Sequence, residues 1–143
     1  MAKENEIKIL LVEDTAEHAL LIRRGLERGM LRHRLFWVDD GEKGLDFLYH
    51  RAEYSDEKEY PRPDVILLDL RLPGISGVEV LEQIRGEEKL KDIPVAVMTV
   101  SDQDEDILRC TRAGAQGYVL KSTALVDIPS AQGILDTIVS LVS

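Results

Sequence analysis

The chain has 143 residues, a length typical of a single domain with its own hydrophobic core. It carries 27 Asp and Glu against 18 Lys and Arg, and this net charge of −9 argues against direct binding to DNA or to an anionic membrane. The single cysteine, Cys110, excludes an internal disulfide. No apolar run reaches signal-peptide length at the N-terminus or the ~20 residues of a membrane helix, so we expect a cytoplasmic protein.

Five short apolar runs predict the strands of a buried sheet. They are nearly continuous and rich in β-branched and aromatic residues, which is typical of strands covered on both faces. The runs are residues 7–12, 35–38, 65–68, 93–98 and 118–120. Because Trp37 lies inside such a run, we expect it in the core.

Amphipathic segments separate these runs. Apolar residues with helical spacing are Ala19, Ile22 and Leu26 in one segment and Val80, Leu81 and Ile84 in another. Strand and helix thus alternate five times, which predicts an α/β fold with a parallel sheet and helices on both faces. In the flavodoxin-like strand order 2-1-3-4-5, the first and third strands are neighbours.

Three segments have less regular patterns. Ser101 and Asp104 predict the start of a helix that stops at Gly114, and residues 51–62 predict a surface loop or a short helical extension. The segment after Pro129 has a wide apolar face, formed by Ile134, Leu135, Ile138, Val139, Leu141 and Val142. It is either a terminal helix packed on the sheet or one that also contacts a partner.

Carboxylates follow two strands that this strand order makes neighbours. Glu13 and Asp14 follow the first strand, and Asp69 follows the third. Sites in open α/β sheets form beyond the carboxyl ends of the strands, so the three carboxylates should converge and repel one another unless a cation joins them. Few carboxylates with room for water are typical of a Mg²⁺ site.

Each of these residues also has a structural interpretation. Asp14 could cap the next helix through a capping box with Glu17, and Asp69 could be an ordinary strand-end residue. Thr99 ends the fourth strand and could be a strand-end residue without a chemical role, and Lys121 follows the fifth strand and could be a solvated charge. Together with the acids, a hydroxyl and an ammonium form a set suited to binding a phosphoryl group.

The ordered set of motifs resembles the receiver domain of two-component response regulators over nearly the whole chain, from Ile7 to about Val142. The matching features are Glu13-Asp14, Asp69-Leu70-Arg71-Leu72-Pro73 with Gly77 and Leu81, Ile93-Pro94 before Thr99, Ala113-Gly114-Ala115 before Tyr118, and Lys121. The resemblance implies a single (βα)₅ receiver domain over residues 1–143, with no output domain. It would be a signalling protein that assists its own phosphorylation and dephosphorylation, not an enzyme in the usual sense.

The resemblance also assigns roles to individual residues. Asp69 would accept a phosphoryl group from a histidine kinase, and Thr99 and Lys121 would hold the phosphoryl oxygens. Asp14, Asp69 and the backbone carbonyl of Arg71 would ligate Mg²⁺ directly, with Glu13 acting through water. Tyr118 is similar to the aromatic that turns inward when the threonine moves toward the phosphate. Arg71 could contact phosphate, crowd a hydrolytic water or point into solvent.

Further details resemble small stand-alone regulators that accompany bacterial and cyanobacterial phytochrome histidine kinases. These details are Pro61 to Leu70, the loop before them, Leu90 to Pro94, and Lys121-Ser122. Several such regulators are dimers, so a homodimer and an unidentified downstream protein are the expected partners besides the kinase. Ser122 departs from the proline usual in receivers, which puts the geometry of that loop in doubt.

Three other functions share parts of this pattern. A phosphatase of the haloacid-dehalogenase type also uses an aspartate nucleophile and Mg²⁺, but it carries a second aspartate where this chain has Arg71. A flavin-binding electron carrier needs a phosphate loop after the first strand, where Glu13 and Asp14 would repel phosphate. A degenerate receiver would act only as an interaction surface. The intact set of acids, threonine and lysine argues against this alternative.

Overall fold

The computed structural model describes residues 6–29, 31–100, 105–121 and 136–142. In chain order the elements are β1 (Ile7–Val12), α1 (Ala16–Arg28), β2 (His33–Val38), α2 (Gly41–Tyr49), the short 3₁₀ helix η2 (Ala52–Tyr54), β3 (Val65–Asp69), α3 (Gly77–Gly86), β4 (Val95–Thr99), α4 (Glu105–Arg112) and β5 (Gly117–Leu120). Residues 136–142 are also helical. Each apolar run predicted as a strand coincides with one of the five strands.

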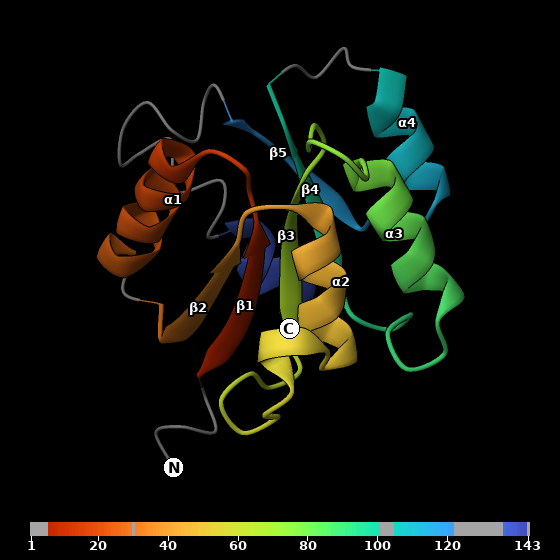
Figure 1. Cartoon of the computed structure of the whole chain (residues 1–143). Coiled ribbons are helices and arrows are strands. Elements are labelled where there is room, and N and C mark those ends of the chain that lie inside the picture. Colours follow the sequence, from red (N-terminus) through yellow and green to blue (C-terminus); the bar gives the residue numbers. More distant parts are fainter. Residues whose placement is uncertain (1–5, 30, 101–104, 122–135, 143) are drawn as a thin grey trace.

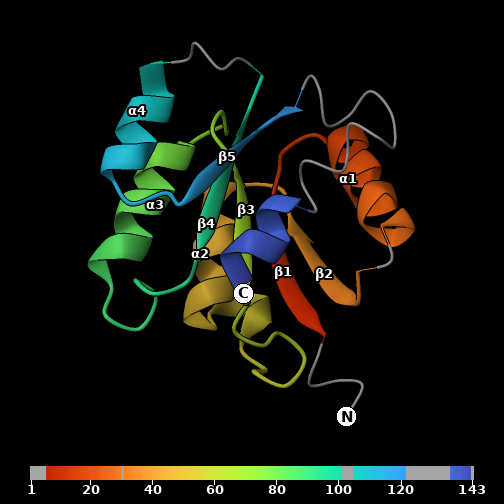
Figure 2. The same ribbon diagram turned by 180° about the vertical axis from the view of Figure 1, so that it is seen from behind.

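The strands form one parallel sheet in the order β2-β1-β3-β4-β5, which confirms the predicted architecture. In Figure 1, α2 and α3 lie in front of the sheet and α4 lies beside α3. The view from behind in Figure 2 brings α1 and the helical segment 136–142 to the front. Helices therefore cover both faces, and this explains why the strand sequences are almost entirely apolar.

Each face of the sheet has its own hydrophobic core. On one face, residues of α2, α3 and α4, including Phe47, Leu81 and Cys110, pack against alternate strand residues. On the other face, Ile22 and Leu26 of α1 and Ile138 pack against the remaining strand residues. Burial of a large apolar side chain contributes about 1.5–3 kcal/mol to stability, so these two layers hold the strand ends in place.

The helix starts explain how the site loops are fixed. Helix α3 begins with a full capping box, in which Ser76 and Glu79 bond each other's backbone amides. Helix α1 begins at Ala16 with Thr15 as its N-cap and no side-chain cap bond. The capping alternative for Asp14 is therefore wrong, because the helix starts one residue later than that alternative requires.

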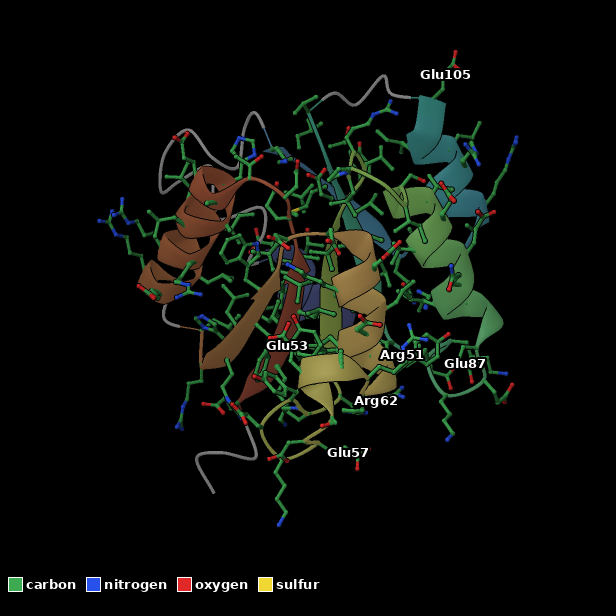
Figure 3. The ribbon with its side chains drawn as sticks, viewed as in Figure 1. Arg51, Glu53, Glu57, Arg62, Glu87 and Glu105 are labelled. Atoms are coloured by element: carbon green, nitrogen blue, oxygen red, sulfur yellow. The ribbon has the colours of Figure 1, made fainter. Side chains whose placement is uncertain are left out.

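The polar segment 51–62 is anchored by aromatic residues. It contains η2, which agrees with the predicted short helical extension. The rings of Tyr54 and Tyr60 lie 5.3 and 5.7 Å from that of Phe47 and 5.1 Å from each other, within the range of favourable aromatic pairs. Figure 3 shows Glu57 and Arg62 of this segment at the lower end of the molecule, away from the connections that leave β1 and β3 at the top.

One core prediction is wrong. Trp37 is 39% exposed, and it lies on β2, which is an edge strand of the sheet. Cys110 is fully buried in α4, and Gly114 follows that helix with a left-handed φ of 105°, as a helix stop requires.

Five residues named in the sequence analysis, Ser101, Asp104, Ser122, Ile134 and Leu135, lie outside the described residues. Within the described ranges, no helix combines the length and apolar character needed to cross a membrane.

Candidate functional site

Three carboxylates converge at the carboxyl edge of the sheet, which is at the top of Figure 1. Glu13 and Asp14 follow β1 and Asp69 ends β3, and one carboxylate oxygen of each lies within 4.8 Å of the others. Glu13 and Asp69 are buried, at 0% and 3% exposure, whereas Asp14 is exposed. The site therefore has two buried acids and one that faces solvent.

The sheet register brings these acids together. In the β1–β3 pair, Leu11 lies opposite Leu67 and Val12 opposite Leu68, so the next residues along the chain, Glu13 and Asp69, lie side by side at this edge of the sheet. Parallel pairing places both carboxyl ends at one edge, as the sequence predicted. Thr15 strengthens the arrangement, because its amide donates a 3.0 Å hydrogen bond to Oε2 of Glu13.

Lys121 joins the two buried acids. Its Nζ lies 2.7 Å from Oε1 of Glu13 and 3.1 Å from Oδ2 of Asp69, and the side chain is 7% exposed. Burial opposes the charged form, but the hydrogen bond that Lys121 donates to Glu13 and the charge of Asp69 raise the pKa of Lys121 overall. The alternative that Lys121 is an ordinary solvated charge is wrong.

The Asp69 carboxyl has an unusual protonation equilibrium. Burial and the neighbouring charge of Glu13 raise its pKa to about 6. Lys121 and the amide of Arg71, which donates a 3.1 Å hydrogen bond to Oδ1, act in the opposite direction. One ammonium does not neutralise the acids around it, so a further cation would favour the ionised form of Asp69.

We expect Asp69 to make the metal-free protein less stable as the pH rises from about 4 to about 7. The folded state keeps the Asp69 proton up to pH about 6, whereas the unfolded chain releases it near 3.8, so folding binds a proton in this window. Denaturant midpoints of the wild type and Asp69→Asn over this range measure the contribution. The variant should gain stability relative to the wild type as pH rises, and parallel curves would contradict the assignment.

The remaining residues predicted for the site differ in how closely they approach it. Thr99 is buried at the end of β4, one position beyond the residue that pairs with Asp69. Tyr118 is 48% exposed on β5, so its ring does not point inward here, and its switch role stays a prediction. The side chain of Arg71 is exposed, while its amide contacts Asp69; a metal-binding role for its carbonyl also stays a prediction.

Two residues beside the acids were not predicted. Trp37 donates a 2.7 Å hydrogen bond from its indole Nε1 to the backbone carbonyl of Glu13. His18 Nδ1 lies 3.8 Å from Oε2 of Glu13, a distance at which a protonated imidazole forms an ion pair. The position of Trp37 beside Glu13 depends on the β1–β2 register, which the sequence alone does not determine. His18 lies in the first turns of the helix that follows the acids.

The donor set fits a small divalent cation. Carboxylate oxygens are the protein ligands that Mg²⁺ prefers, and Mg²⁺ usually keeps several water molecules. The exposed Asp14 leaves one side open for those waters, and Glu13 and Asp69 supply buried negative charge. A separate pocket of about 700 Å³, lined by residues that include His50, Arg62 and Lys89, shares no residue with this site.

Comparison with known proteins agrees with this geometry. The response regulator receiver domain model matches residues 9–131. The probable methanogenesis regulatory protein FilR2 of Methanothrix harundinacea is 41% identical over 87% of this chain and 78% of its own length. Response regulator Rcp1 of Synechocystis is 38% identical over 88% of this chain and 84% of its own length.

Solved structures extend the match to three dimensions. The phosphorylated cyanobacterial phytochrome response regulator RcpA superposes with a TM-score of 0.84 at 34% identity, covering 96% of this chain and 97% of that one. The Mn²⁺-bound form of Rcp1 superposes with a TM-score of 0.73 at 32% identity, covering 95% and 89%. The fold, the converging acids and the family match agree, and the chain belongs to the response regulator receiver domain family.

Proposed function

We propose that Asp69 accepts a phosphoryl group from a histidine kinase in a Mg²⁺-dependent reaction. The observation that carries this proposal is the contact of Lys121 with both Glu13 and Asp69 at the edge where Asp14 also lies. This set combines a carboxylate nucleophile, a cation for the phosphoryl oxygens and a second set of oxygens for a metal.

Each residue of the site has its own role in the proposed reaction. A carboxylate oxygen of Asp69 attacks the phosphorus of a phosphohistidine, the phosphorus–nitrogen bond breaks, and an acyl phosphate forms while the histidine nitrogen leaves with the electron pair. Lys121 balances negative charge on the phosphoryl oxygens, and Thr99 donates a hydrogen bond to one of them. Bound Mg²⁺, held by Asp14 and Asp69 and through water by Glu13, would stabilise the charge that develops on the phosphoryl group.

Phosphorylation transmits its signal by changing the surface of the protein around α4 and β5. The acyl phosphate draws Thr99 inward, and Tyr118 then moves from its exposed position into the space that opens, which shifts the population toward a second surface around α4 and β5. A downstream protein that prefers this surface would read the signal. The switch requires that Tyr118 start outside, as it does here.

The kinase partner that the relatives favour is a phytochrome. RcpA and Rcp1 resemble this chain over nearly its whole length, and RcpA is described as a phytochrome response regulator. We infer a histidine kinase of the phytochrome type as the phosphodonor and a homodimer as one form of the regulator. Val139, which is 47% exposed in the helical segment 136–142, offers apolar surface for such a contact.

Intact mass spectrometry after incubation with acetyl phosphate and Mg²⁺ tests the proposal. We expect the wild type to gain the mass of one phosphoryl group and Asp69→Asn to gain none. Chelation of Mg²⁺ should suppress the adduct in the wild type, because the buried acids then repel the incoming phosphoryl group. Glu57→Gln, a change of an exposed acid outside the site, is the matched control and should be phosphorylated normally.

Two results would overturn this function in favour of a rival. An adduct of equal yield in Asp69→Asn would place the phosphoryl group elsewhere, and the absence of an adduct in the wild type would favour a degenerate receiver. Steady hydrolysis of p-nitrophenyl phosphate would favour a phosphatase. Size-exclusion chromatography with light scattering, with and without phosphorylation, measures the homodimer.

A further inference from the structure

Trp37 is an exposed aromatic residue that makes a short hydrogen bond to the acidic site. Its side chain is 39% exposed at the end of the edge strand β2. Its indole Nε1 nevertheless donates to the backbone carbonyl of Glu13 at 2.7 Å. An edge-strand tryptophan whose polar atom points at a backbone group beside the acids calls for an explanation beyond core packing.

The bond from Trp37 is one of two hydrogen bonds that join β2 to the backbone of Glu13. The β1–β2 register ends with Val12 opposite Val38, and the amide of Glu13 still donates to the carbonyl of Val38 at 3.0 Å. The chain then turns toward α2, whose N-cap is Asp40. The Glu13 carbonyl accepts the indole N–H of Trp37, so both backbone polar groups of Glu13 are held by β2.

The peptide unit held in this way joins Glu13 to Asp14. The Glu13 carboxylate is fixed independently, by Lys121 at 2.7 Å and by the Thr15 amide at 3.0 Å. Within the described ranges, the Asp14 carboxylate has no such contact, and it is exposed. The direction of the Asp14 side chain therefore depends on the peptide plane that precedes it.

We propose that Trp37 is a positioning residue that orients the Glu13–Asp14 peptide so that the Asp14 carboxylate is directed at the divalent cation. This inference rests on the proposed function, because it assigns the acids to a metal. Trp37 touches neither the cation nor the phosphoryl group. Its contribution is to reduce the freedom of an exposed ligand before the cation arrives, as preorganised sites do.

The indole N–H is the atom to test. Replacing Trp37 with 3-benzothienylalanine keeps the size and shape of the side chain and exchanges the N–H for sulfur, and Trp37→Phe is the simpler version. Leu35→Ala is the matched control, because Leu35 lies on the same strand and packs into the core without contacting the acids. Calorimetric titration gives the Mg²⁺ dissociation constant of each protein, and urea denaturation gives its stability.

We expect both Trp37 variants to bind Mg²⁺ about threefold to tenfold more weakly, the effect of losing one hydrogen bond. The benzothienylalanine protein should lose no more stability in urea than one hydrogen bond contributes, and added Mg²⁺ should stabilise it less than it stabilises the wild type, which a purely structural role would not cause. Leu35→Ala should lose stability and keep its Mg²⁺ affinity. In the wild type, the indole N–H resonance should shift on addition of Mg²⁺.

The outcomes separate this inference from the proposed function. If the wild type binds Mg²⁺ and is phosphorylated while the benzothienylalanine protein binds Mg²⁺ equally tightly, the role of Trp37 is overturned and the function stands. The same holds if Leu35→Ala weakens Mg²⁺ binding as much as Trp37→Phe does. If the wild type neither binds Mg²⁺ nor is phosphorylated, both fail.

Discussion

Lys121→Met is expected to lower the free energy of unfolding at pH 7 by about 3 kcal/mol and to abolish phosphorylation. Lys121 is the cation that contacts both buried acids, so its removal leaves Glu13 and Asp69 close together without a counter-ion. Because Lys121 lowers the pKa of Asp69, this pKa should rise above about 6 in the variant. Urea denaturation without metal measures the loss.

The loss should depend on pH and on Mg²⁺ in a defined way. At pH about 5 a proton on Asp69 relieves the repulsion, so the variant should be closer to the wild type than at pH 7. Mg²⁺ should recover part of the stability because it takes over the counter-charge. Lys91→Met, which removes an exposed lysine 3.1 Å from Glu88, is the control and should change stability by less than about 0.5 kcal/mol. An equal loss in both variants would contradict the role of Lys121.

Gly77→Ala is expected to destabilise the protein by about 2–3 kcal/mol and to slow phosphorylation sharply. A Cβ at Gly77 would lie 2.4 Å from the carbonyl oxygen of Asp69 and 2.9 Å from Cα of Leu70. Both contacts are with backbone, so either the start of α3 or the end of β3 must move. A shift of β3 displaces the Asp69 carboxylate from Lys121, and we expect the phosphorylation rate to fall with it.

Gly86→Ala provides a matched control in the same helix. Nothing lies within 4 Å of a Cβ added at Gly86, and alanine is the better helix former. This variant should gain about 0.5–1 kcal/mol and be phosphorylated like the wild type. Thermal denaturation and the rate of adduct formation compare the two variants. The clash is not the cause if Gly77→Ala is as stable and as reactive as Gly86→Ala.

The arrangement of the acids followed from the sequence because few rules determine it. Continuous apolar runs predict buried parallel strands, and parallel strands end at the same edge of the sheet. The positions of the strand ends and the order of the strands were enough to predict that Glu13 and Asp69 lie close together. The close contact of Lys121 with both acids was less accessible, because a lysine after a strand has the same sequence pattern whether it is solvated or buried.

The predictions from sequence that were wrong concern residues whose environment is set by tertiary contacts. Trp37 has the sequence of a core residue, but it lies on an edge strand, and exposure there depends on what covers the sheet. Asp14 matches a capping box, but Thr15 is the N-cap. The packing of Tyr54 and Tyr60 on Phe47 joins α2 to the polar segment 51–62, whose composition gives no periodic signal.

The anchored segment 51–62 makes this receiver convenient to label or immobilise. Glu57 is 77% exposed on that segment, at the end of the molecule away from the connections that leave β1 and β3 (Figure 3). The native Cys110 is fully buried, so a cysteine introduced at Glu57 would be the accessible thiol. A dye or a sensor surface attached there would leave the carboxyl edge of the sheet open to a kinase and to metal.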